Sequence, residues 1–254
     1  MADPGLYGPD SVTWRVHGDP VMALAGPRAL LLQALQPDAM AGVAGSSGFR
    51  DDPWGRLHRT AEYVGVTTFG STAEAERAGA RVRGIHHRLG LDDPHLLLWV
   101  HCTEVESFLT TVTRCGLRLS GEEKDQYYLE QVANARLVGL ETAPTTREAM
   151  AEYFRTMRPE LHATPAAREA ARFVLSPPLT GRLRTLKPAW LGIAGISVAM
   201  LPRWARRMYR LPGLPTTDVG ATAAGIALRT SLLALPEHLR HGPHFREALE
   251  RLAS

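Results

Sequence analysis

The stretch STAEAERAGARVRGIHHRLG, residues 71–90, carries the clearest structural signal in this 254-residue chain. It begins with a capping-box pattern, because Ser71 is followed three residues later by Glu74. A helix from about Ala73 to Leu89 is therefore predicted. Its apolar residues recur every three or four positions and form one stripe, which consists of Ala75, Ala78, Val82, Ile85 and Leu89.

Two adjacent histidines lie near the end of this predicted helix. His86 follows Val82 by four residues and lies at the edge of the apolar stripe, whereas His87 lies about 100° further round the helix. We therefore expect His86 to face inward. A neutral imidazole that faces a core is either a hydrogen-bonded structural histidine or a metal ligand, and the pattern leaves both open.

Similar helix-start signals recur along the rest of the chain. Asp51-Asp52-Pro53 and Asp92-Asp93-Pro94 each combine a capping aspartate with a proline in the first turn, and Ser120 again precedes a glutamate by three residues. No segment shows the sustained alternation of a strand, so the sequence predicts an all-α fold. We expect one helical domain over residues 1–254, with an irregular arm at 1–20 and a glycine-rich segment at 37–49.

Composition excludes several classes of protein. The net charge is only +3, and arginines are interspersed with carboxylates along most of the chain, so no nucleic-acid partner is expected. Cys102 and Cys115 are expected to be buried free thiols, as in a reducing compartment. No signal peptide is recognisable, and the longest apolar run, residues 189–201, is too short to span a bilayer. A cytoplasmic location is expected, and homo-oligomerisation is left open.

A second group of polar residues lies on the helix that begins at Pro53. Arg56, Arg59 and Thr60 occupy positions i, i+3 and i+4 and share one face. Arginine is suited to gripping carboxylates, because its planar fork donates two parallel hydrogen bonds. A solvated face with ordinary ion pairs is the alternative. His101, on the helix that begins at Pro94, also faces inward by its spacing and is the rival to His86 as a ligand.

The order of these segments resembles the MpaB and rubber oxygenase catalytic domain family, which includes the latex clearing protein. The resemblance covers roughly residues 19–210. Its landmarks are Gly26-Pro27-Arg28-Ala29-Leu30-Leu31-Leu32-Gln33, Phe49-Arg50-Asp51-Asp52-Pro53, Arg56 with Arg59 and Thr60, Thr68-Phe69-Gly70, the helix with His86, Leu97-Leu98-Trp99-Val100-His101-Cys102-Thr103, Leu119-Ser120, Tyr127-Tyr128-Leu129-Glu130, Leu137-Val138-Gly139 and Leu201-Pro202.

The resemblance implies a globin-like helical core that holds haem b. His86 matches the family's proximal iron ligand, and Arg56 and Thr60 match residues that line the haem pocket. Arg59 stands where the rubber enzyme has a lysine that can occupy the distal iron position. A guanidinium stays protonated and offers no lone pair to iron. Arg59 is instead expected to donate a charge-assisted hydrogen bond to bound dioxygen or peroxide, which makes Arg59 and Thr60 the candidate catalytic residues.

The chain also departs from the family. No carboxylate lies between Asp38 and Asp51, where the rubber enzyme keeps its proposed catalytic base, and this argues against polyisoprene as the substrate. The favoured hypothesis is a haem b-dependent oxygenase or oxidoreductase that acts with dioxygen or peroxide on a hydrophobic small molecule, such as an isoprenoid or an aromatic compound. The reaction type and the substrate are left open.

Two other hypotheses remain at the level of the sequence. The first is a non-catalytic protein that binds haem or another hydrophobic ligand. The second is a peripheral membrane protein that makes weak contact with a membrane surface. In that case the segment Trp190–Leu201 and the arginines that follow it, Arg203, Arg206, Arg207 and Arg210, would contact the anionic leaflet.

Overall fold

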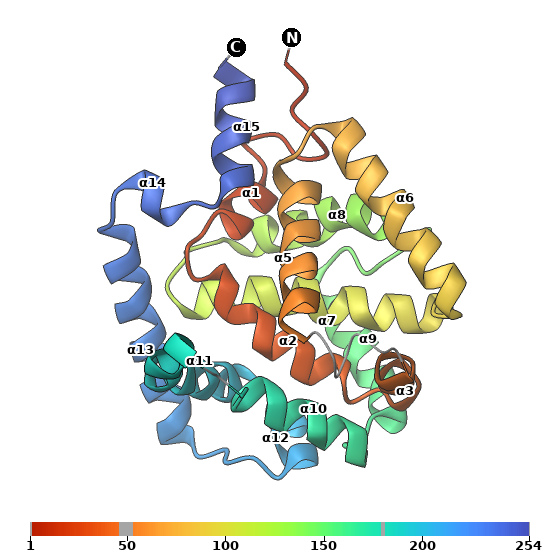
Figure 1. The fold of residues 1–254 in the computed structure, drawn as a ribbon, viewed down its shortest axis with the longest axis vertical. Coiled ribbons are helices and arrows are strands. Elements are labelled where there is room, and N and C mark those ends of the chain that lie inside the picture. The colour runs from red at the N-terminus through yellow and green to blue at the C-terminus, as the bar shows by residue number, and fades with distance from the viewer. Residues whose placement is uncertain (1, 46–52, 179–180, 254) are drawn as a thin grey trace.

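A computed structural model describes residues 2–45, 53–178 and 181–253 of the chain (Figure 1). Within these residues the secondary structure consists of helices without strands, so the predicted all-α fold class is confirmed. The elements are α1 (Val12–His17), η1 (Met22–Leu24), α2 (Ala25–Gln33), α3 (Pro37–Gly45), α5 (Pro53–Phe69), α6 (Thr72–Leu89), α7 (Pro94–Arg114), α8 (Gly121–Leu137), α9 (Arg147–Met157), η2 (Arg158–Glu160), α10 (Pro165–Leu175), η3 (Gly181–Leu186), α11 (Lys187–Met200), α12 (Arg203–Tyr209), α13 (Pro215–Leu233), α14 (Glu237–Arg240) and α15 (Pro243–Ala253).

The helix starts follow the sequence signals closely. Ser71 and Ser120 each form a full capping box with the glutamate three residues on, and the Asp93 side chain caps α7 ahead of Pro94. These side chains accept hydrogen bonds from backbone N–H groups that have no partner inside the helix. Gly90 ends α6 in the left-handed conformation with φ of 64°, which glycine adopts without strain.

One segment differs from the prediction. The irregular arm predicted for residues 1–20 contains α1, where the Ser11 side chain accepts a hydrogen bond from the backbone N–H of Trp14 and Glu130 of α8 accepts one from the N–H of Thr13. The prediction of an irregular arm is therefore wrong over Val12–His17, because the partner that stabilises this helix is distant in sequence. The glycine-rich segment forms a helix, α3, as far as Gly45.

The core is built around α7, which packs against α2 and crosses behind α5 in Figure 1. Trp99 of α7 is fully buried; its indole N–H donates to the carbonyl of Gln33, 3.1 Å away, and its ring packs edge-on against Phe154. The buried apolar cluster extends from Val12 to Tyr209. The single domain and the globin-like arrangement of its core remain predictions.

A smaller apolar cluster joins the two ends of the chain. It contains Trp14, Phe69 and Phe245, whose rings meet at centroid distances of 5.1 to 5.5 Å. The Arg251 guanidinium of α15 donates to the carbonyls of Phe69 and Asp3, at 2.7 and 3.0 Å. Helix α15 is thus fixed to both α5 and the N-terminal arm, and the two termini lie near each other (Figure 1).

Among the described helices, none has the length and apolar character needed to cross a membrane.

Candidate functional site

The predicted face of α5 lies partly at the surface. Arg59 and Thr60 are both exposed, and the side chain of Arg56 lies outside the described part of the structure. The same face continues one turn on to Tyr63, which is half-buried and near Asn134 of α8, with Oη 3.4 Å from Oδ1. The face predicted to line a pocket therefore runs from solvent into the interior along one helix.

His86 and His87 differ as the helical spacing predicts. His86 is half-buried and its Nδ1 atom is shielded from solvent. The His87 side chain is 82% exposed and hydrogen-bonds Asp92 through Nδ1, at 2.8 Å. The preference for His86 as the inward histidine is confirmed. Its position is fixed by the end of α6, where its carbonyl accepts a hydrogen bond from the Leu91 N–H at 2.9 Å.

The apolar stripe of α6 does not stay buried along its whole length. Ala75 is buried and Val82 is half-buried, but Ile85 is exposed and Leu89 is 54% exposed. The stripe thus leaves the core at the last two turns of the helix, beside His86. Two large apolar side chains therefore remain at the surface next to a partly buried imidazole.

His101 is buried on α7, as predicted, and burial lowers its pKa to about 4. The imidazole is therefore neutral at physiological pH and keeps a lone pair. Glu104 lies one turn later on the same helix, and burial raises its pKa to about 7. Sequence reasoning missed Glu104, because a lone carboxylate inside a helix carries no motif and its burial depends on the neighbouring helices.

Tyr63 lies where α5 approaches Asn134 of α8, and charged groups of α6 and α7 act on its phenol. Burial raises the pKa of the Tyr63 phenol above its usual value; the charge of Glu104 on α7 raises it further, and the charge of Arg83 on α6 lowers it. His86 lies three residues beyond Arg83, and His101 lies three residues before Glu104. His86 and His101 are therefore each about one helical turn, along their own helices, from a residue whose charge acts on Tyr63.

The helix connections set the direction in which each of these helices runs. Helix α6 turns back after Gly70, so moving toward its C-terminus means moving toward the N-terminus of α5, where Thr60 lies. Figure 1 shows α5 and α6 diverging from the turn that joins them. Helix α7 then starts from the end of α6, and His101 lies in its N-terminal half. That Thr60, His86 and His101 face a common region between α5, α6 and α7 remains a prediction.

His17 is a further buried histidine that the sequence did not single out. Its Nδ1 lies 2.7 Å from Oγ1 of Thr68, and its Nε2 lies 3.0 Å from the hydroxyl of Tyr127. Both ring nitrogens are thus engaged by side chains, and burial lowers the pKa of His17 to about 3. His17 therefore serves as a neutral hydrogen-bonded link between α1, α5 and α8.

The chemical types of the candidate residues on α5 and α6 are those that a haem site requires. Within the described ranges, no group of three or more His, Cys, Asp or Glu side chains could hold a metal ion. Haem iron needs only one axial side chain from the protein, and a histidine commonly provides it. Among the candidate residues, His86 is a half-buried imidazole beside the exposed apolar residues Ile85 and Leu89, and Arg59 is an exposed cation on α5.

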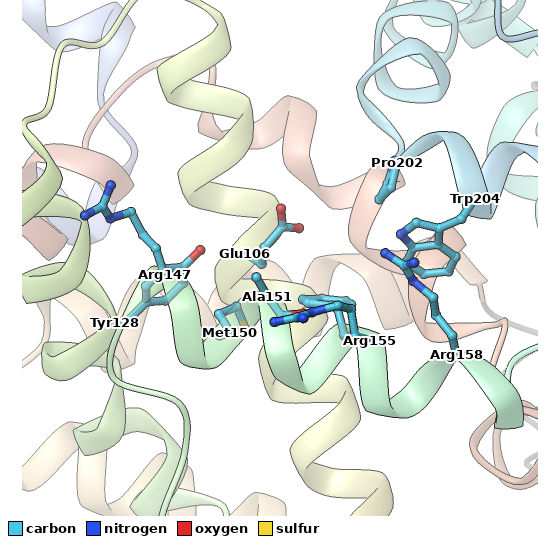
Figure 2. A pocket seen from close by; sticks show the side chains of 10 residues that line it. Glu106, Tyr128, Arg147, Met150, Ala151, Arg155, Arg158, Pro202 and Trp204 are labelled. Carbon is cyan, nitrogen blue, oxygen red and sulfur yellow. The ribbon is translucent and has the colours of Figure 1, made fainter.

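A separate groove lies on the other side of α7. Its cavity of about 300 Å³ is bordered by α9 and α12, and Figure 2 shows Arg155 and Arg158 along one wall with Trp204 beside them. The Arg158 guanidinium lies 5.6 Å from the centre of the Trp204 ring. At the other end, Arg147 is paired with Asp125 at 3.0 Å. None of the residues predicted for the site lines this groove.

The described residues form an all-α fold in which the charges of Glu104 and Arg83, from two other helices, act on the half-buried Tyr63 of α5. The chain belongs to the MpaB and rubber oxygenase family: the family model described as "ER-bound oxygenase mpaB/B'/Rubber oxygenase, catalytic domain" matches residues 14–231. The family implies an oxygenase-type activity with a small-molecule substrate. Neither the curated proteins nor the solved structures include a significant match to the chain.

Proposed function

We propose that the chain is a haem b-dependent oxygenase that uses dioxygen or peroxide and acts on a hydrophobic small molecule. The observation that carries this proposal is the half-buried His86 beside exposed apolar residues of α6, in a chain whose family is one of oxygenases. When bound, haem supplies the redox chemistry of oxygen activation. The protein supplies the ligand, the orientation and the proton donors.

Each candidate residue has a distinct role in this proposal. His86 holds the iron, and His101 is the rival ligand because it is buried and neutral. Arg59 and Arg56 provide cations for the propionates, and Arg59 offers fixed N–H donors to an anionic group in the site. Thr60 provides a hydroxyl on the same face of α5.

Glu104 adds a group that can hold or release a proton. Its pKa of about 7 means that both protonation states are populated near neutral pH, which suits a general acid or base. The family's proposed carboxylate base has no counterpart between Asp38 and Asp51. Glu104, delivered from α7 instead of the glycine-rich segment, is our candidate for that role.

Absorption spectra of the haem-reconstituted protein test the ligand. Wild type is expected to show a Soret band that His86→Ala abolishes or shifts and that His101→Ala retains. Circular dichroism should confirm that both variants are folded. Absence of the band in wild type would contradict the proposal, and loss of the band only in His101→Ala would move the ligand to α7.

Catalysis is tested separately by oxygen consumption with isoprenoid and aromatic substrates. Turnover that falls in Arg59→Ala and Glu104→Gln, with the Soret band kept, would support the oxygenase. A protein that binds haem but turns over none of these substrates would be a non-catalytic binder.

We also propose a cytoplasmic location. Its support is that Cys102 and Cys115 are both buried free thiols, the state that a reducing compartment maintains.

A further inference from the structure

Helix α13 directs its charges into the protein and leaves its outer face uncharged. Asp218 accepts two hydrogen bonds from Arg206 of α12, at 2.6 and 3.0 Å. Arg229 donates to the buried carboxylate of Asp19, at 2.7 Å. These are the two charged residues of α13, and they lie eleven residues apart, on the same face of the helix. A surface helix ordinarily shows the opposite arrangement.

The outward side of α13 is a continuous apolar and small-residue stripe, which we call the α13 stripe. Its members follow helical spacing and are all exposed; they are Val219, Ala223, Ile226, Thr230 and Leu233. Val219 is 71% exposed, and the exposed Leu235 and Leu239 extend the apolar surface into α14. In Figure 1, α13 lies along the edge of the molecule. Contiguous exposed apolar side chains of this size mark an interaction surface.

The part of the chain around the α13 stripe is also depleted of negative charge. Residues 170–236 contain nine Lys and Arg and a single carboxylate, Asp218, whereas the remaining residues contain 20 basic and 25 acidic side chains. Arg203 lies beside Asp218, with Nε 3.9 Å from Oδ2, and its side chain is 61% exposed. Arg207 and Arg210, which precede the exposed Leu214, are exposed as well. The apolar stripe is therefore flanked by basic residues.

We propose that the α13 stripe docks onto an anionic lipid bilayer, with Arg203, Arg207 and Arg210 contacting the headgroups. An apolar face flanked by basic side chains matches an anionic leaflet in both respects. A second copy of this chain is a poorer match. A second copy would offer these arginines little to pair with, because residues 170–236 contain a single carboxylate, Asp218, and it already accepts hydrogen bonds from Arg206.

This surface differs from the one expected from the sequence. The segment Trp190–Leu201 is predicted there to contact the membrane, but Ala194, Ser197 and Met200 of α11 are buried. Arg206 is also among the predicted headgroup contacts, yet its side chain is only 3% exposed and is occupied by Asp218. Leu191 of α11 is 48% exposed, but the longer run of exposed apolar side chains belongs to α13, which packs against α11. The proposal does not depend on haem or on turnover.

Vesicle co-sedimentation of the full chain tests the proposal, with phosphatidylcholine vesicles compared with mixed phosphatidylcholine and phosphatidylglycerol vesicles. Wild type should bind the mixed vesicles and release at high salt. Ile226→Glu should weaken binding by at least about tenfold, because it places a charge in the face that the proposal inserts into the bilayer. Leu129→Glu is the matched control: Leu129 is also exposed, on α8, and its substitution should leave binding unchanged.

The basic flank has its own pair of variants. Arg207→Gln should weaken binding to the mixed vesicles by about fivefold, which corresponds to one headgroup contact. Arg81→Gln, at an exposed position of α6, should not weaken it. Circular dichroism melting should show that all four variants are folded.

Three outcomes would overturn the proposal. Wild type could fail to bind the mixed vesicles. Ile226→Glu and Leu129→Glu could weaken binding equally. Light scattering could show a wild-type dimer that Ile226→Glu dissociates without any loss of vesicle binding, in which case a second copy covers the α13 stripe.

Discussion

The guanidinium of Arg28 lies 2.6 Å from the carboxylate of Glu106, and this ion pair joins α2 to α7 inside the protein. Arg28 is almost fully buried and also donates to the Met200 carbonyl at 3.0 Å and to the Ser107 hydroxyl at 2.5 Å. One side chain thus links α2, α7 and the end of α11. The free-energy cost of burying this charge is offset because each of these neighbours accepts from the guanidinium or pairs with it.

Removing Arg28 should therefore destabilise the fold strongly. In Arg28→Ala, Glu106 loses its ion-pair partner and the Met200 carbonyl loses its donor, so we expect a loss of about 3–5 kcal/mol in the free energy of unfolding. Urea denaturation measures this loss. Arg172→Ala, at an exposed position of α10, is the control and should change the free energy by less than about 0.5 kcal/mol. Similar losses in the two variants would contradict the assignment.

Two glycines of α6 should respond to alanine in opposite directions. A Cβ atom at Gly79 would lie 2.9 Å from both Cβ and the carbonyl oxygen of Leu137, so Gly79→Ala should cost about 1–3 kcal/mol by forcing α6 and α8 apart. At Gly84 the nearest atom is the flexible end of Arg88, 3.6 Å away. Gly84→Ala should stabilise the helix by about 0.5–1 kcal/mol. Thermal unfolding compares the pair, and a destabilised Gly84→Ala would count against the packing described.

The acid sensitivity of the haem-free protein should reflect three buried groups. Burial lowers the pKa of His17 to about 3 and of His101 to about 4, so both stay neutral in the folded protein while the unfolded chain takes up protons below its histidine pKa of 6.5. The stability that these two neutral histidines contribute to the fold is complete above pH 6.5 and is lost as the pH falls below it. Glu104 acts oppositely: its raised pKa keeps it protonated in the fold, so it destabilises the fold increasingly from about pH 4.5 to 7.

Between about pH 5 and 6 two histidines oppose one carboxyl, so wild type should lose about 1.4 kcal/mol of stability per unit of acidification. His101→Gln should flatten this slope nearly to zero, and Glu104→Gln should roughly double it. Urea unfolding at several pH values measures both. Slopes that change in the same direction in the two variants would rule out opposite contributions from His101 and Glu104.

The arginine at position 59 yields a spectroscopic prediction that rests on the proposed haem site. Arg59 cannot ligate iron, whereas a lysine amine can once it is deprotonated. Arg59→Lys should therefore convert the ferric haem spectrum toward a six-coordinate low-spin form at alkaline pH. Arg59→Gln is the control and should not change the coordination. An unchanged spectrum in Arg59→Lys would mean that Arg59 does not face the iron.

The sequence predicts most helix starts because their determinants are local. Ser71 and Ser120 need only the glutamate three residues on, and Asp93 needs only the proline that follows. The choice of His86 over His87 is also local, since it depends on helical spacing within α6. Helix α1 escapes prediction because Glu130, which caps its first turn, lies more than a hundred residues away.

Long-range packing likewise decides the parts of the site that the sequence leaves undetermined. The pKa of Glu104 depends on its burial by the helices packed around α7, and no spacing on α7 reveals it. The inward charges of α13 follow the same logic, because Asp19 lies 210 positions before Arg229 in the chain. Periodicity identifies which residues face inward. It does not identify which of these residues lie next to a charged partner from a distant part of the sequence.

Helix α15 and the N-terminal arm hold each other through Arg251 and the aromatic cluster, and the two termini consequently lie close together. The two ends of the chain therefore lie close enough in space to be joined. A short linker between its ends should permit circular permutation, with new ends opened in an exposed turn such as that at Gly116. Residues that now begin and end the chain would then become an internal loop beside α5, without any change in the helices that surround Tyr63.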